Sequence, residues 1–128
     1  MPIRVVRLGS ARAKGEGTRI GTVRRPPRGV PKAEFASQNW YDVWFPGLAP
    51  SVATMKLGQG ATTRAQWTAF IRKYRAEMAR PDQARTIELL AKLSHHASFS
   101  VGCYCENDTR CHRSVLRELL RERGAVIA

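Results

Sequence analysis

The sequence predicts an α/β protein, a small three-layer Rossmann-like domain with a largely parallel sheet. Short apolar runs typical of strands occur near both ends of the chain, and helical patterns lie between them. The resulting order is strand, strand, irregular segment, helix, helix, strand, helix, strand, which favours parallel pairing through helical crossovers. The chain has 128 residues and is 43% hydrophobic, enough for one core, so we expect a single domain over residues 1–128.

The first quarter of the chain is expected to form two strands and a stiff loop. Residues 3–8 (IRVVRL) and 18–23 (TRIGTV) have the length and apolar content of short strands. Residues 24–31 (RRPPRGVP), which we call the proline loop, contain three prolines and one glycine. Proline fixes its own backbone and restricts the residue before it, so this loop is predicted to be irregular and to display its arginines, Arg24, Arg25 and Arg28.

The middle of the chain is expected to be an irregular flap followed by two helices. Residues 35–57 are rich in aromatic side chains but are interrupted by prolines and a glycine, which predicts a flap that covers the core or walls a pocket. Thr63 and Gln66 have the spacing of a capping box, and an apolar stripe follows at helical spacing. Pro81 fits the first position of the next helix.

The last third of the chain is predicted to contain a buried strand, a polar turn, a helix and a short terminal strand. Residues 99–105 alternate as a strand does, which places Cys103 on the same face as Cys105. Asp108 and Thr109 are both suitable N-caps for a helix that begins near Arg110 or Cys111. Gly124 is a natural residue to follow that helix, and residues 125–128 are then expected to form a strand.

The charge of the chain favours acidic partners. The formal net charge is +12, and residues 1–32 contain nine Lys or Arg against one Glu. Such a surface attracts phosphate esters and polyanions, so nucleic acid is an alternative partner to a phosphorylated small molecule or another anion. No apolar run is long enough to span a membrane and no secretory signal is evident, so we expect no membrane partner and a cytoplasmic location with reduced cysteines. The sequence leaves the oligomeric state open.

Residues 103–113 combine thiols, a histidine and arginines at the junction of a strand and a helix, which is where open α/β sheets bind ligands. The first interpretation is an anion site. The helix N-terminus would attract negative charge, Arg110 and Arg113 would supply forked donors, and Arg28 from the proline loop would face them. The alternative is that these arginines pair with nearby carboxylates.

Two further chemistries compete for the same residues. Cys111 in the first turn of a helix, beside His112, is a candidate catalytic nucleophile, although neighbouring helical residues point about 100° apart. The cysteine–arginine spacing of a phosphatase loop is absent. A structural zinc or iron–sulfur site would use Cys103, Cys105, Cys111 and His112, but one residue between the first two cysteines is shorter than the usual spacing. No cofactor is predicted, and whether the protein is an enzyme is left open.

Four stretches of the chain resemble the family known as domain of unknown function 488, in particular its YeaO-like branch. They are TVRRPPRGVPK, WFPGLAPS, TRAQWTAFIRKYRAEMARP and VGCYCENDTRCHRSVLREL, in this order. The resemblance implies a Rossmann-like α/β fold and a shared cleft around four polar residues, Arg28, Arg110, His112 and Arg113. It implies no reaction. The chain departs from that branch in having Arg25-Pro26 before the turn and in having both Cys103 and Cys105.

Overall fold

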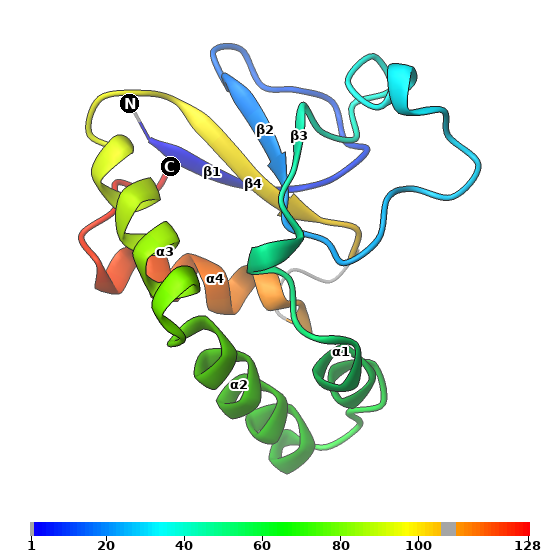
Figure 1. Cartoon of the computed structure of the whole chain (residues 1–128), viewed down its shortest axis with the longest axis vertical. Coiled ribbons are helices and arrows are strands. Elements are labelled where there is room, and N and C mark those ends of the chain that lie inside the picture. The colour runs from blue at the N-terminus through cyan, green and yellow to red at the C-terminus, as the bar shows by residue number, and fades with distance from the viewer. Residues whose placement is uncertain (1, 106–109) are drawn as a thin grey trace.

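The computed structural model describes residues 2–105 and 110–128. Its sheet consists of four parallel strands in the order β1-β4-β2-β3 (Figure 1). Val101 in the central strand β4 lies opposite Val5 of β1 and Ile20 of β2. The α/β class and the parallel sheet are therefore confirmed. The strands are β1 (Ile3–Arg7), β2 (Thr18–Gly21), β3 (Val43–Trp44) and β4 (Phe99–Cys103).

The helices gather on one face of the sheet (Figure 1). Since side chains alternate along a strand, Phe99 and Val101 of β4 both reach this face, where they join the main core with Leu116 of the last helix. That core also contains residues from the two central helices, so one apolar cluster joins the sheet to the helical layer. The helices are α1 (Val52–Gln59), α2 (Arg64–Met78), α3 (Pro81–Leu93) and α4 (His112–Glu122), with 3-10 turns at η1 (Lys32–Glu34) and η2 (Pro46–Leu48).

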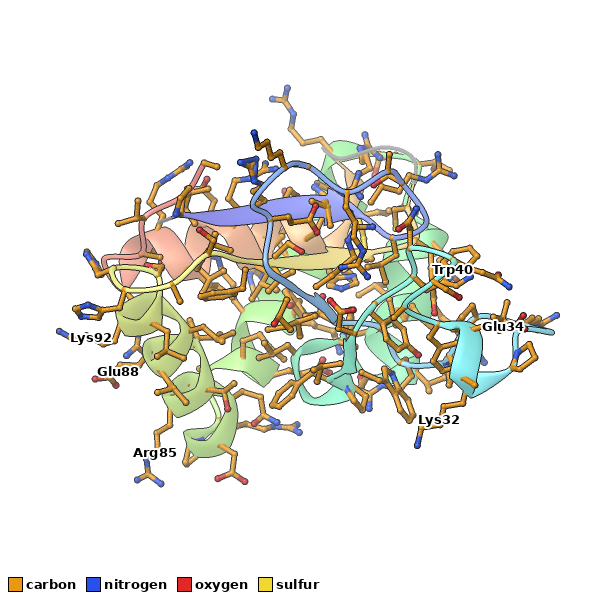
Figure 2. The ribbon with its side chains drawn as sticks, turned by 90° about the horizontal axis from the view of Figure 1, so that it is seen from above. Lys32, Glu34, Trp40, Arg85, Glu88 and Lys92 are labelled. Carbon is orange, nitrogen blue, oxygen red and sulfur yellow. A yellow bond between two sulfur atoms is a disulfide. The ribbon has the colours of Figure 1, made fainter. Side chains whose placement is uncertain are left out.

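The opposite face of the sheet is covered by irregular segments. The segment between β1 and β2 crosses this face (Figure 2), and Glu16 from it accepts a hydrogen bond from the Ser100 hydroxyl of β4 at 2.7 Å. Arg19 of β2 lies beside Ser100 in the register and donates to the backbone carbonyls of Ser10 and Asn39. A layer of irregular segments, joined to the sheet by polar side chains, therefore replaces helices on this side.

The ends of the helices follow the sequence closely. Thr63 and Gln66 form both hydrogen bonds of the predicted capping box of α2, and Pro81 is the first residue of α3. Gly124 has a φ of 85°, a left-handed conformation that glycine adopts without steric cost, as expected after a helix. The N-cap of α4 is Cys111. The predicted caps Asp108 and Thr109 lie outside the described residues.

Two sequence predictions need correction. The irregular flap expected over residues 35–57 contains the short strand β3 and most of helix α1, so that prediction is wrong in part. The terminal strand expected over residues 125–128 is reduced to one parallel bridge between Ile127 and Ile3. Among the helices that the structure describes, we find none with the length and apolar character needed to cross a membrane.

Candidate functional site

A cavity of about 1060 Å³ lies beyond the carboxyl ends of the strands. Arg7 at the end of β1, Val23 just after β2 and Cys103 at the end of β4 all line it. Residues of α1 and α2 close the side toward the helices, with Met55 and Trp67 among them. The cavity therefore occupies the position at which parallel α/β sheets bind ligands.

The cavity has a cationic lining. Two of the predicted anion-binding residues, Arg28 of the proline loop and Arg110, lie on its wall although 82 residues separate them in sequence. None of the described lining residues is Asp or Glu. The positive end of α4 is also present, because Cys111 and His112, the N-cap and first residue of that helix, line the cavity. The whole lining therefore favours an anion. Its arginines are Arg7, Arg24, Arg25, Arg28 and Arg110.

Arg113, the third predicted anion-binding residue, occupies a different position. Only 4% of Arg113 is exposed, and it is not among the cavity-lining residues. Its charge nevertheless acts on the site: burial lowers the pKa of His112 and the Arg113 guanidinium lowers it further, whereas burial raises the pKa of Cys105 and the guanidinium opposes that rise. The structure thus brings Arg28 and Arg110 to one cavity and leaves Arg113 buried outside its lining. Direct anion binding by Arg113 stays a prediction.

The proline loop is fixed to the rest of the molecule at two points. Arg24 donates from Nε to the carbonyl of Pro50 and from Nη2 to the carbonyl of Ala49, both at 3.1 Å. The hydroxyl of Tyr104, which follows β4, donates to the carbonyl of Arg25 at 2.9 Å. The arginine side chains of the loop therefore belong to two groups. Arg24 is a structural anchor, and Arg25 and Arg28 are exposed at the cavity.

Aromatic rings form the other part of the lining. Trp40 and Tyr104 contact each other edge-to-face, with ring centroids 5.9 Å apart. On the helical side, Trp67 stacks on Phe70 at 4.6 Å, and the Arg110 guanidinium lies 5.8 Å from the Trp67 ring centre. All these rings line the cavity. Flat apolar surfaces beside guanidinium groups suit a ligand that carries both an aromatic ring and a negative charge.

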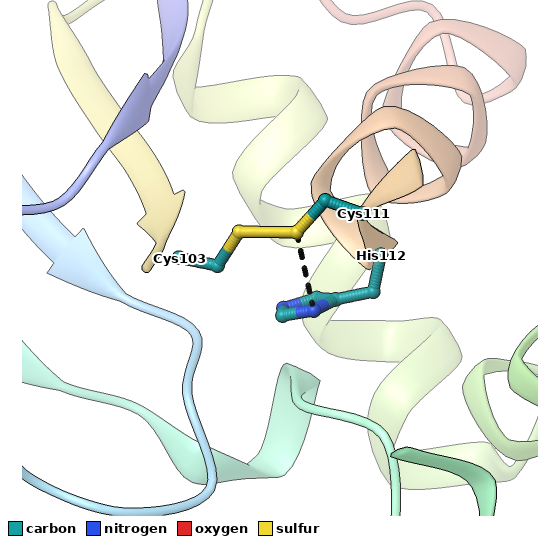
Figure 3. Close-up of side chains that lie close together, drawn as sticks. All are labelled: Cys103, Cys111 and His112. Atoms are coloured by element: carbon teal, nitrogen blue, oxygen red, sulfur yellow. Dashed lines mark hydrogen bonds between the residues drawn. A yellow bond between two sulfur atoms is a disulfide. The ribbon is translucent and has the colours of Figure 1, made fainter. Parts of the chain in front are cut away.

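Cys103, Cys111 and His112 lie close together (Figure 3), and all three line the cavity. The Sγ atoms of the two cysteines are joined as a disulfide, whereas the sequence predicts reduced thiols. The Cys111 Sγ atom lies 3.9 Å from Nδ1 of His112. Both cysteines are 1% exposed. We call these three residues the Cys–His cluster.

The orientation of His112 is fixed by the backbone of the neighbouring strand segment. Its Nε2 atom lies 2.7 Å from the carbonyl oxygen of Thr22. A carbonyl can only accept, so Nε2 carries the hydrogen, and the lone pair of the neutral ring is on Nδ1, facing Cys111. Burial lowers the pKa of His112 to about 4, against the opposing effect of the bond to Thr22. The imidazole is therefore neutral at pH 7.

Cys111 and His112 lie closer together than the sequence predicts. Neighbouring residues inside a helix point about 100° apart, which predicts that His112 is poorly placed relative to Cys111. Cys111, however, is the N-cap, with φ −133° and ψ 151°, an extended conformation that turns its side chain back toward the ring. That prediction is wrong because it assigns Cys111 to the helix itself.

The fourth predicted metal ligand is not part of the cluster. Cys105 is exposed and lines the cavity, but in the described part of the chain the metal-compatible group contains only Cys103, Cys111 and His112. Burial raises the pKa of the Cys105 thiol. Trp40 belongs to the aromatic segment that was expected to cover the core or wall a pocket, and it lines the cavity; the places of Trp67 and Tyr104 in the lining were not predicted. Their aromatic character was visible in the sequence, but their meeting at one cavity depends on the tertiary fold.

Comparison with known families identifies the chain. The model of DUF488-N3a, described as the active DUF488-N3 subclade, matches residues 3–124. The chain belongs to the DUF488 family. This membership confirms the resemblance seen in the sequence, and the YeaO-like branch stays an expectation. We find no significant match among curated proteins or among solved structures.

Proposed function

We propose that this DUF488 protein binds a phosphorylated small molecule with an aromatic group, of the nucleotide class, in the cavity at the carboxyl ends of its strands. The observation that carries the proposal is the composition of one lining: arginines, aromatic rings and a helix N-terminus, with no acidic side chain among the described lining residues. In this arrangement Arg28 and Arg110 contact the phosphate, and Trp40 or Trp67 stacks on the ring.

A reaction on the bound ligand would take place at the Cys–His cluster. The cluster lines the same cavity, and the matching subclade is described as active, which supports a catalytic role for DUF488-N3 proteins. Cys111, once its bond to Cys103 is reduced, and His112 stay our predicted catalytic residues. The bond between His112 Nε2 and Thr22 leaves Nδ1 as the ring atom that is available for chemistry.

Nucleotide binding is tested by calorimetry on the reduced protein with adenosine and uridine monophosphates, the corresponding nucleosides and inorganic phosphate. We expect the nucleotides to bind more tightly than either of their parts. Arg28→Ala and Arg110→Ala should each weaken nucleotide binding about tenfold or more, because a charge-assisted hydrogen bond contributes about 1.5–3 kcal/mol.

Arg85→Ala is the matched control. Arg85 is an exposed residue of α3 at the end of the molecule away from Trp40 (Figure 2), and its loss changes the net charge equally. It should leave nucleotide affinity unchanged. If no nucleotide binds at low salt, or if Arg85→Ala weakens binding as much as Arg110→Ala, the proposal is wrong. Tighter binding of single-stranded oligonucleotides, with a steep dependence on salt, would favour the nucleic-acid alternative instead.

A further inference from the structure

We propose that Cys103, Cys111 and His112 bind one zinc ion, with the fourth coordination position open to the cavity. The three ligand atoms lie within 4.8 Å of one another. Zinc binds thiolate sulfur at about 2.3 Å and imidazole nitrogen at about 2.0–2.1 Å, so the ligands of a tetrahedral site are themselves roughly 3.5–4 Å apart. The cluster needs only small side-chain shifts to reach that geometry.

The second support is the orientation of the histidine. A ligating histidine characteristically donates its other ring hydrogen to a carbonyl or carboxylate, which fixes the tautomer. His112 does this through Nε2 to the Thr22 carbonyl at 2.7 Å, and leaves Nδ1 directed at Cys111. The ring is thus already in the tautomer and the direction that a metal at the cluster requires.

The third support is the separation of the two cysteine backbones. The Cα atoms of Cys103 and Cys111 are 7.8 Å apart. Disulfides usually have Cα separations of about 4.4–6.8 Å, so a direct bond is poorly suited to this backbone. A metal between the sulfurs adds length to the bridge and fits the wider separation. We therefore infer that the reduced pair, with zinc between the thiolates, is the working form of the cluster.

Charge and access are consistent with zinc. Each thiol releases one proton when it binds the ion, and the two resulting thiolates neutralise Zn²⁺ while His112 stays neutral. Cys111 is the N-cap of α4, where the helix dipole stabilises a thiolate. All three ligands line the cavity, so the remaining position faces solvent or ligand. Three protein ligands and one open position are the pattern of catalytic zinc sites.

This inference deepens the proposed function by naming what lies at the reactive end of the cavity. It also limits the sequence prediction, since Cys111 and His112 would act as metal ligands and not as a nucleophile and its base. Its test uses no nucleotide, so the two proposals can fail separately. Arg28→Ala, which should lose nucleotide, should still bind zinc.

The experiment measures zinc in the full chain, purified under a phosphine reductant without chelator and reconstituted with Zn²⁺. We expect one zinc per chain, which a competing chromophoric chelator removes slowly. Cys103→Ser, Cys111→Ser and His112→Gln should each weaken zinc affinity by more than about 100-fold, since even the loss of a group that hydrogen-bonds to a metal ligand costs about 10–100-fold. Cys105→Ser is the matched control and should retain zinc fully.

Two measurements on the unsubstituted protein test the proposal even if a variant fails to fold. Replacing zinc with Co²⁺ should give the sulfur-to-cobalt charge-transfer absorption of a tetrahedral thiolate site. Alkylation followed by peptide mass spectrometry should modify Cys105 at once, and Cys103 and Cys111 only after a chelator is added. Zinc that stays absent after reduction and reconstitution overturns the proposal, as does equal loss of zinc in Cys105→Ser. Cysteines whose alkylation is unchanged by chelator would also contradict it.

Discussion

Glu16 and Arg19 form an ion pair that is buried on the loop-covered face of the sheet. Glu16 is 3% exposed and Arg19 is 0% exposed, and the Arg19 Nε atom donates to Glu16 Oε2 at 2.7 Å. Burial alone would raise the pKa of Glu16. The hydrogen bonds from Arg19, Ser100 and the Ala13 amide outweigh it and lower the pKa to about 2. This carboxylate therefore holds the segment between β1 and β2 onto β4.

Glu16→Gln should lower the free energy of unfolding by about 3 kcal/mol, because Arg19 then stays buried without its counter-charge. The pH dependence has a definite sign. Since the pKa of Glu16 falls from 4.5 to about 2 on folding, its contribution is complete above pH 4.5 and is lost as the pH falls toward 2. Urea denaturation at pH 7 and pH 3 measures how much the free energy of unfolding falls between the two pH values, and this fall should be smaller in Glu16→Gln than in the unsubstituted protein. An equal effect from the exposed control Glu34→Gln would contradict this assignment.

The sequence predicts the structural position of some of these residues but not of others. Arg28 and Arg110 could be predicted to share a cavity, because a proline loop after one strand and a helix start after another both lie at the carboxyl ends of a parallel sheet. Glu16 and Arg19 could not, because charged residues three apart in a polar segment are usually solvated. Their burial follows from the path of the loop across Ser100, which local spacing does not determine.

At the scale of elements, α1 and α2 show which sequence signals are sufficient to predict a helix. Helix α2 has a capping box and an apolar stripe, and its predicted start agrees with the structure. Helix α1 has Gly58 within it and only Thr54 buried, so it has no such stripe. It is held instead by contacts with other segments: the Ser51 and Thr54 hydroxyls donate to Glu77 of α2 at 2.6 and 2.8 Å. Hydrogen bonds between residues far apart in the chain leave no pattern in the local sequence from which they could be predicted.

Thr63→Ala should lower the free energy of unfolding by about 1 kcal/mol, since the amide of Gln66 loses its capping oxygen. Thr68→Ala, at an exposed position in the same helix, is the control. It removes the same side-chain atoms and raises helix propensity, so it should leave stability unchanged or increase it slightly. Chemical denaturation of both variants measures the difference. Equal losses would show that the cap of α2 contributes nothing.

At the scale of the whole molecule, the cavity lies where the helical layer and the loop layer meet beyond the sheet. The second apolar cluster lies at this junction and shares Leu8, Val23, Cys103 and Cys111 with the cavity wall. Tyr41 completes it, packed so closely on Gly21 that a Cβ atom there would lie 2.3 Å from the Tyr41 ring. The same residues therefore form part of the packed core and part of the cavity wall.

Thermal unfolding of the reduced protein should follow one transition, because the strands of one sheet connect both clusters. Far-ultraviolet circular dichroism reports the helices, and near-ultraviolet circular dichroism reports the aromatic rings around the cavity. We expect the two melting curves to coincide, as they do for small cooperative domains. Loss of the near-ultraviolet signal well before the helices melt would indicate that the cavity region unfolds separately.

The two attachments of the proline loop have a consequence for affinity. Arg24 and the Tyr104 hydroxyl hold the backbone on which Arg25 and Arg28 are mounted, and proline restricts the rest. The proline loop therefore loses most of its conformational entropy when the protein folds. Binding of a ligand then costs little additional entropy in the loop. Tight binding of the proposed nucleotide by an otherwise irregular stretch of chain is thus thermodynamically reasonable.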